Sequence, residues 1–293
     1  MCPALFTPDF RANDFVQALM EFLLECIGFP PDWDLGRVAE EVRDHGEPAA
    51  WRGPDGEHLR LALADGLELR LDQDDEREPS LWPFYTSRYR RRIAVSGLDS
   101  IPDSAHDAIL RGVTDPIAPI EHEVGDWRFS DLEAMREFAP GHPLVTYLTD
   151  AKRLPRALPK GHVLAVNVTG FALSIDYLGP NECGADPDVL EEPHGARLEP
   201  LGGADNPVAC MEISMRIRSI SHMKNALTGE PVNRIELDAP GAPLEVFISP
   251  WQLERDNLPH PQPGSRIEGV FLLIGSIVGG LPRAKSRRYV AFG

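Results

Sequence analysis

The sequence predicts an α+β protein, with N-terminal helices and an antiparallel sheet followed by a mainly antiparallel β domain. Apolar residues recur at three- and four-residue steps near the N-terminus, as in helices, whereas the second half alternates apolar and polar residues, as in strands. The 25 Gly and 28 Pro of this 293-residue chain exceed the combined share of about 12% in average proteins, which favours many turns. The length favours two domains, an acidic one over residues 1–150 and a β-rich one over residues 161–293.

Two helices are expected near the N-terminus, over residues 9–27 and 35–45. The first is expected to end at Gly28, because Gly and the prolines that follow it stop a helix. A β-hairpin follows, with strands over residues 58–63 and 67–72. Its leucines fall on one face and its charged residues on the other, so the charged face of this sheet is expected to lie in water.

The rest of the chain is predicted to form mainly strands. A capping-box pattern at Ser130 predicts one further helix, which ends near Phe138. Residues 152–160 are expected to form a linker, and residues 181–207, which nearly lack large apolar side chains, a long exposed insertion. No internal repeat is evident. Strands are expected over residues 81–95, 163–168, 171–178, 209–221, 234–238, 244–249 and 266–278.

Residues 209–280 show the most specific order of expected elements. A long strand is followed by a turn near Gly229, two shorter strands, a helical turn over residues 250–255 and a closing strand introduced by Pro263 and Gly264. This order resembles an OB-fold-like small barrel, in which one helix lies between the third and fourth strands. The resemblance implies binding of an oligonucleotide or an oligosaccharide on one face. A different antiparallel sheet is the alternative.

If the barrel forms, basic and aromatic residues in this region are the candidate ligand-binding residues. Proteins that bind single strands combine a cationic groove with aromatic side chains on which bases stack. The net charge of −17 opposes this function because it repels phosphate at long range, and alternating arginines also occur on the solvent side of ordinary strands. The candidate residues are Arg216, Arg218, His222, Lys224 and Trp251.

A second basic group interleaves arginines with Tyr89 and is a candidate anion-binding patch. The alternative is an edge strand whose charges discourage aggregation or pair with the acidic N-terminal region. The patch consists of Arg88, Arg90, Arg91 and Arg92.

Acidic residues are concentrated near the N-terminus, where residues 9–78 contain 19 Asp and Glu against 7 Arg. Such asymmetry indicates an acidic face toward water or toward a cationic partner. The leading hypothesis is therefore a non-enzymatic protein-interaction function, of the inhibitor, immunity or adaptor type, with a basic protein as partner. Complementary charge speeds such encounters, so the association is expected to depend on salt. Nucleic-acid or oligosaccharide binding is the second hypothesis and an unrecognised enzyme the third.

No motif in the sequence identifies a catalytic residue, a metal site or a cofactor site. The nucleophile elbow, the phosphate-binding loop, the dinucleotide fingerprint and the zinc-protease motif are all missing. Glu121 and Glu123 flank His122, but in a strand they would face away from it. The four cysteines show no paired spacing. The N-terminus lacks the pattern of a signal peptide, and the longest apolar stretch is shorter than the ~20 residues of a membrane span, so a cytoplasmic protein without membrane contact is expected.

Overall fold

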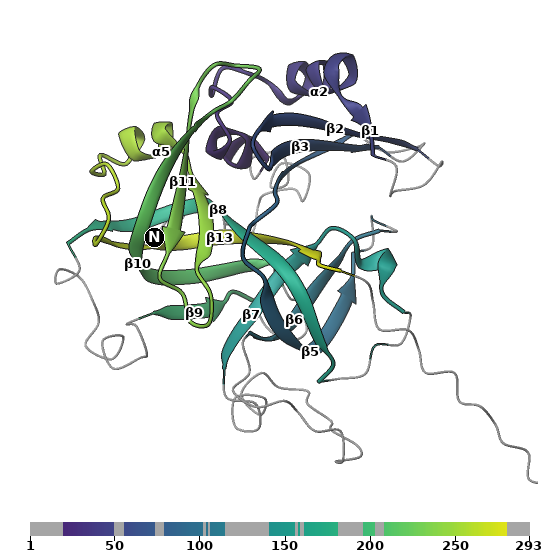
Figure 1. Ribbon diagram of the computed structural model, residues 1–293. Coiled ribbons are helices and arrows are strands. Elements are labelled where there is room, and N and C mark those ends of the chain that lie inside the picture. The colour runs from purple at the N-terminus through teal and green to yellow at the C-terminus, as the bar shows by residue number, and fades with distance from the viewer. Residues whose placement is uncertain are drawn as a thin grey trace, which may run out of the picture.

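The protein is an α+β molecule built mostly from strands (Figure 1). The computed structural model describes residues 20–49, 56–73, 79–101, 104, 106–114, 141–155, 158, 161–180, 196–202 and 208–279. The expected helix over residues 130–138 lies outside these ranges. So does the first part of the expected helix over residues 9–27, of which residues 20–26 are helical.

Short helical segments accompany the strands. They are α2 (Leu35–His45), the 3-10 turn η2 (Ala151–Arg153) and α5 (Pro250–Arg255). Side chains cap both α-helices at the N-terminus, since Asp34 accepts from the Arg37 amide at 2.7 Å and Ser249 accepts from the Gln252 amide at 3.1 Å. The caps fix where the two helices begin.

Within the described ranges, thirteen strands form a four-stranded and a nine-stranded sheet. The smaller sheet holds β1 (Glu47–Pro48), β2 (Glu57–Ala64), β3 (Leu67–Gln73) and β4 (Ser80–Tyr85). The larger sheet holds β5 (Arg91–Ser100), β6 (Ala108–Thr114), β7 (His142–Leu148), β8 (Val163–Gly179), β9 (Arg197–Pro200), β10 (Cys210–Lys224), β11 (Pro231–Leu237), β12 (Leu244–Ile248) and β13 (Arg266–Ile277).

The leucine face of the smaller sheet packs under α2, at the top of the molecule in Figure 1. Its charged face is only partly covered by the larger sheet. Trp82 stacks on Tyr147 of β7 with ring centroids 4.7 Å apart, and Arg70 donates to the Thr149 hydroxyl at 3.1 Å. Arg60 and Ala62 of β2 remain exposed, so the expected wet face is confirmed at these residues and wrong where the face contacts the larger sheet.

The nine-stranded sheet closes on itself twice. The strands β8, β5, β6, β7 and β13 are neighbours in that order, and the pairing of β13 with β8 closes a first ring of five strands. The strands β10, β11, β12, β8 and β13 form a second ring, because β10 pairs with both β11 and β13. Strands β8 and β13 belong to both rings, which explains their unusual length.

The two rings repeat one plan that is not evident in the sequence. Along the chain, each ring contributes three strands, a helical segment and a fourth strand. The fifth strand of each ring is the fourth strand of the other ring, and it runs parallel to the third strand: β13 pairs with β7 in the first ring, and β8 pairs with β12 in the second. Both first strands carry a bulge, after Val95 in β5 and after Ile217 in β10. A glycine two residues before each fourth strand forms the same hydrogen bond in both rings. The amide of Gly161 donates at 2.7 Å to the carbonyl of Val95, and the amide of Gly264 donates at 2.7 Å to the carbonyl of Ile217. Both glycines have positive φ, 79° and 87°, a region that favours glycine.

The order of elements predicted for residues 209–280 is confirmed, with α5 lying between β12 and β13. Within the expected insertion over residues 181–207, the structure describes residues 196–202. Residues 197–200 form β9, which pairs with β10, and the side chain of Leu198 is buried. Strands β6 and β7 were not expected from the sequence.

Candidate nucleic-acid interface

Two arginines predicted as ligand-binding residues lie on the outer face of the second ring. Arg216 and Arg218 are exposed on β10, and each faces a carboxylate at the end of β11. The Arg216 guanidinium lies 2.6 Å from the Asp238 carboxylate. The Arg218 Nε lies 3.5 Å from the Oε1 atom of Glu236. The two arginines are thus held in place by acidic residues of the neighbouring strand.

The segment between β4 and β5 adds a third arginine to the same place. The Arg88 guanidinium contacts the other oxygen of Glu236 at 2.5 Å. It also lies 4.9 Å from the centroid of the Tyr89 ring, within the range of a cation–π contact. One residue from each of the two basic groups predicted from the sequence therefore meets at a single carboxylate. We call Arg88, Arg216, Arg218, Glu236 and Asp238 the arginine cluster.

A buried carboxylate supports this cluster from below. Glu245 on β12 is only 1% exposed. It accepts a hydrogen bond of 2.6 Å from the Ser87 hydroxyl, which fixes the segment that carries Arg88. Arg234 lies 3.7 Å from the Glu245 Oε1 atom, and it donates to Ser221 and to the Tyr85 hydroxyl. That Oε1 atom has no hydrogen-bond partner among the described residues.

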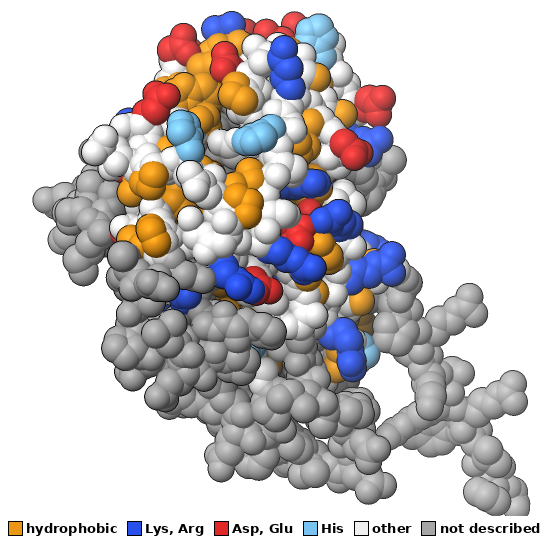
Figure 2. Space-filling view, turned by 60° about the vertical axis from the view of Figure 1, so that its left-hand side comes forward, with side chains coloured by type: hydrophobic (Ala, Val, Ile, Leu, Met, Phe, Trp, Pro, Cys, Tyr) orange, Lys and Arg blue, Asp and Glu red, His pale blue; other side chains and the backbone are white. Residues whose placement is uncertain are grey.

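The guanidinium groups of the arginine cluster are more open to solvent than its carboxylates. The side chains of Arg88, Arg216 and Arg218 are 61%, 51% and 56% exposed, whereas those of Glu236 and Asp238 are 9% and 22% exposed. Because cations form the outer layer, a ligand that approaches this face meets positive charge first. Figure 2 shows Lys and Arg side chains, with a few carboxylates between them, gathered over the middle of the face that it presents.

Glu236 alters the pKa of two residues in the segment between β4 and β5, Arg88 and Tyr89. Its hydrogen bond and charge raise the pKa of Arg88 above the ordinary value, so this guanidinium stays charged. Partial desolvation, together with the Glu236 carboxylate, raises the pKa of Tyr89. Arg90, the next residue, is exposed and forms no ion pair within the described residues. With Arg234 and Glu245 included, four arginines face three carboxylates here.

The bulge in β10 separates the other candidates on this strand from Arg216 and Arg218. An extra residue reverses the alternation of faces, so the residues beyond it point to the opposite side. His222 bonds with Asn233 at 2.9 Å on that opposite side, and Lys224 shares it by register. Trp251, half-buried on α5, makes no hydrogen bond or ring contact with the arginine cluster among the described residues.

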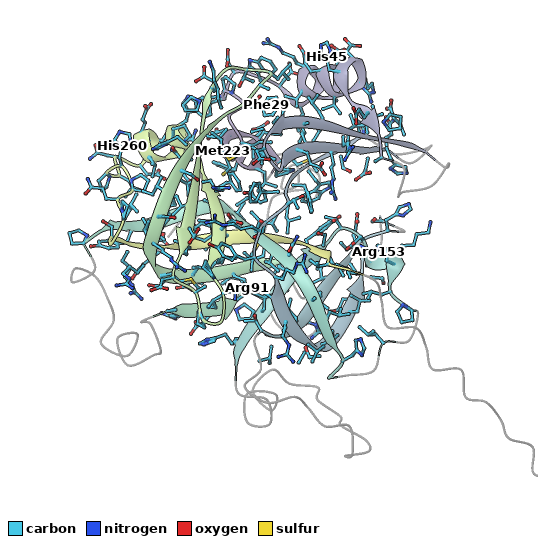
Figure 3. All side chains as sticks on the ribbon, in the orientation of Figure 1. Phe29, His45, Arg91, Arg153, Met223 and His260 are labelled. Atoms are coloured by element: carbon cyan, nitrogen blue, oxygen red, sulfur yellow. The ribbon has the colours of Figure 1, made fainter. Side chains whose placement is uncertain are left out.

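The second predicted patch is also divided. Arg91 is 2% exposed and donates to the backbone carbonyls of Pro240, at 3.0 Å, and Ala242. It lies between β5 and the loop after β11, where it ties the two rings together (Figure 3). Arg92 is exposed on β5. Arg88, which belongs to the arginine cluster, and Arg90 are therefore exposed to solvent. Arg91 instead binds backbone carbonyls inside the fold.

Elsewhere in the described part of the chain, polar side chains do not form a second solvent-exposed site of this kind. His58 shares a hydrogen bond of 2.8 Å with Asp72, and its ring lies 5.4 Å from that of His106. This group is enclosed between the smaller sheet and the first ring. Within the described ranges no group of three or more His, Cys, Asp and Glu side chains is arranged to hold a metal ion. None of the helices in those ranges has the length and hydrophobicity needed to span a bilayer.

Sequence reasoning identified the arginines but missed their partners. Arg234, Glu236 and Asp238 alternate with apolar residues in one short strand, which was a signal that they share a face. Nothing in the sequence indicated that Glu245, in a strand otherwise apolar, lies behind them. Residues that act together across three strands are found only when the strand pairing is known.

Comparison with known proteins gives no family for this chain. No protein-family model matches it, and no curated protein is similar to it. Among solved structures, the chain is similar to the cytoplasmic molybdate-binding protein ModG, crystallised with molybdate bound, with 14% sequence identity and a TM-score of 0.32. The similarity covers 67% of this chain and 98% of the ModG chain.

Proposed function

We propose that the protein is a nucleic-acid-binding module and that the arginine cluster is its binding surface. The observation that carries this proposal is the convergence of exposed guanidiniums from two distant segments, Arg88 from one and Arg216 and Arg218 from the other, on one outer face of the second ring. Arginine suits phosphate because its planar fork donates two parallel hydrogen bonds.

The strand order of the rings supports a binding role. We infer that each ring is a barrel of the OB type, because five strands close with a helix between the third and fourth and with the third and fifth parallel. Barrels of this type bind oligonucleotides or oligosaccharides across the outer face of their second and third strands. In the second ring these strands are β11 and β12, but every residue of β12 is buried, so the surface open to a ligand lies at β10 and at the end of β11, beside Glu236.

The local charge favours nucleic acid over a neutral sugar. An oligosaccharide needs few cations, whereas four arginines gather around this face. The net charge of −17 opposes a polyanion only at long range, because salt screens exposed charges beyond about 8 Å at physiological ionic strength. At contact distance the arginines decide the interaction.

The test is titration of fluorescein-labelled oligonucleotides with the protein, read by fluorescence anisotropy at several salt concentrations. The triple variant R88A/R216A/R218A is expected to bind much more weakly. The slope of its logarithmic binding constant against the logarithm of the salt concentration should be smaller by about two, since each phosphate contact on a single strand contributes roughly 0.7. The matched control is R43A/R60A, which removes two ion-paired arginines on α2 and β2. Absence of binding by the wild-type protein, or an equal loss in the control, would refute the proposal. If a labelled neutral oligosaccharide binds more tightly than the oligonucleotides, the ligand class is an oligosaccharide and not a nucleic acid.

A second candidate function is docking of a basic protein on the acidic face of α2. Glu40 and Asp44 are exposed there, one helical turn apart, and neither forms an ion pair within the described residues. Figure 2 shows carboxylates along the upper rim of the molecule. The variant E40K/D44K is expected to abolish a salt-sensitive association with the basic protein captured by the wild type. An association that is equally strong in the variant, or insensitive to salt, would count against this function.

A further inference from the structure

In this structure the arginine cluster is closed by its own carboxylates. Glu236 engages Arg88 and Arg218 with its two oxygens, and Asp238 engages Arg216. Each guanidinium that could bind a phosphate already contacts an anion. A phosphate that takes the donors used in these contacts must therefore compete with the two carboxylates.

The two carboxylates come from residues that are close together in the chain. Glu236 lies near the end of β11 and Asp238 directly follows its last residue, so their Cα atoms lie at most about 7 Å apart. Successive phosphates of an extended nucleic-acid backbone have a similar separation. We propose that Glu236 and Asp238 mimic two successive phosphates, and that they keep the arginine cluster closed until a single-stranded nucleic acid displaces them. This inference rests on the proposed function.

A single strand fits this face better than a duplex. Arg216 and Arg218 lie two positions apart on β10, and Arg88 meets Arg218 at Glu236, so the three guanidiniums form one small patch. Tyr89 lies beside Arg88 and is only half-buried. An aromatic ring next to such a patch suits an unpaired base, which can stack on it, whereas the bases of a duplex are already stacked on one another.

The strand pairing shows why Glu236 can be displaced. Glu236 lies directly opposite Glu245 in the register of β11 and β12. Like charges in directly opposed positions repel each other, and the arginines offset this repulsion. When Arg88 and Arg218 turn to a phosphate, the repulsion from Glu245 favours movement of the Glu236 side chain toward solvent. The small Ser219 opposite Glu236 on β10 leaves it room.

Removal of the two charges should therefore strengthen binding. Exposed ion pairs contribute little each, so the variant E236Q/D238N is expected to bind a single strand about tenfold more tightly, not by many orders of magnitude. The control is E47Q/D99N, which removes two carboxylates that are paired with Arg60 and Arg111 away from the cluster. It changes the net charge by the same amount, and its affinity is expected to stay within about twofold of wild type.

The experiment measures the anisotropy of a fluorescein-labelled single-stranded oligonucleotide of mixed sequence, and of the corresponding duplex, with these proteins and with R88A/R216A/R218A. Tighter single-strand binding by E236Q/D238N alone supports the inference. Wild-type binding that this variant leaves unchanged or weakens overturns the inference but leaves the proposed function standing. Absence of binding by every protein overturns both.

Two further outcomes are separated by the same titration. An equal gain for the duplex overturns the assignment to a single strand. An equal gain in E47Q/D99N shows that net charge, not displacement, sets the affinity. Thermal unfolding checks that each variant is folded. If E236Q/D238N is unfolded, D238N alone takes its place, because Asp238 is more exposed than Glu236. Its expected gain is about threefold, and an unchanged affinity overturns the inference.

Discussion

Strands β8 and β13 belong to both rings, so the two rings are expected to unfold as one unit. Phe171 on β8 tests this expectation. It is 0% exposed, and its ring stacks on Phe247 of β12 with centroids 5.4 Å apart. Phe247 in turn meets Tyr85 edge to face at 5.1 Å. The substitution Phe171→Ala removes the centre of this aromatic group.

The magnitude follows from burial. Replacing a fully buried Phe with Ala costs about 3–5 kcal/mol, because transferred apolar surface is lost and a cavity remains. For a chain of this length the entropy of unfolding is roughly 0.6 kcal/mol per kelvin, so the melting temperature should fall by about 5–8 °C. Amides that exchange only through global unfolding should lose protection by roughly two to four orders of magnitude.

Native-state hydrogen exchange followed by mass spectrometry measures each ring separately. In Phe171→Ala, the peptides of β6 in the first ring and of β11 in the second should lose protection by the same factor. Ile274→Ala, at the matching position of β13, should do the same at a cost of about 2–5 kcal/mol. Leu98→Ala, at an exposed position on β5, should change stability by less than about 0.5 kcal/mol. A loss confined to β11, with β6 unaffected, would refute the reasoning.

Two other predictions concern cysteine reactivity and backbone conformation. Burial raises the pKa of Cys26 to about 12 and that of Cys210 to about 11, so at about pH 8 their thiolate fractions fall roughly 1000-fold and 100-fold below those of exposed thiols. Peptide mass spectrometry should find both unmodified by iodoacetamide until denaturant is added, and fast labelling of the native protein would contradict this. Because the folded-state pKa values are raised, the stability from these thiols is present below the unfolded pKa of about 9 and is lost as the pH rises. The substitutions Gly161→Ala and Gly264→Ala should each cost about 1–2 kcal/mol, since both positions have positive φ, and a cost near zero in urea unfolding would contradict the assigned turn.

The sequence predicts the elements of the second ring because their signals are local. Alternating side chains, the capping serine of α5 and Gly264 before β13 are each readable within a few residues. Ring closure is not local. It needs β8, which lies outside residues 209–280 and pairs with β12 in parallel. Parallel pairing over such a separation leaves no mark on either strand.

The candidate site, like the second ring, could be predicted only in part from local sequence. Charge alone singles out Arg88, Arg216 and Arg218, but charge does not tell them from Arg91, which is buried against backbone carbonyls. The bulge that turns Lys224 away from the first three is a matter of register between two strands. Residue types thus predicted the chemistry of the surface, and strand pairing decided which residues share it.

The repeat of the two rings gives an internal comparison for the arginine cluster. By register, Ser96 takes the bulge position that Arg218 holds in the second ring, and Arg111 takes the position of Glu236. Ala94, which is buried, takes the position of Arg216. Both rings therefore close with the same bulge but without the same charges, so the fold requires the backbone feature and not the arginines. Charges that the fold does not require, held by Glu236 and Asp238 on an exposed face, are available to the ligand proposed above.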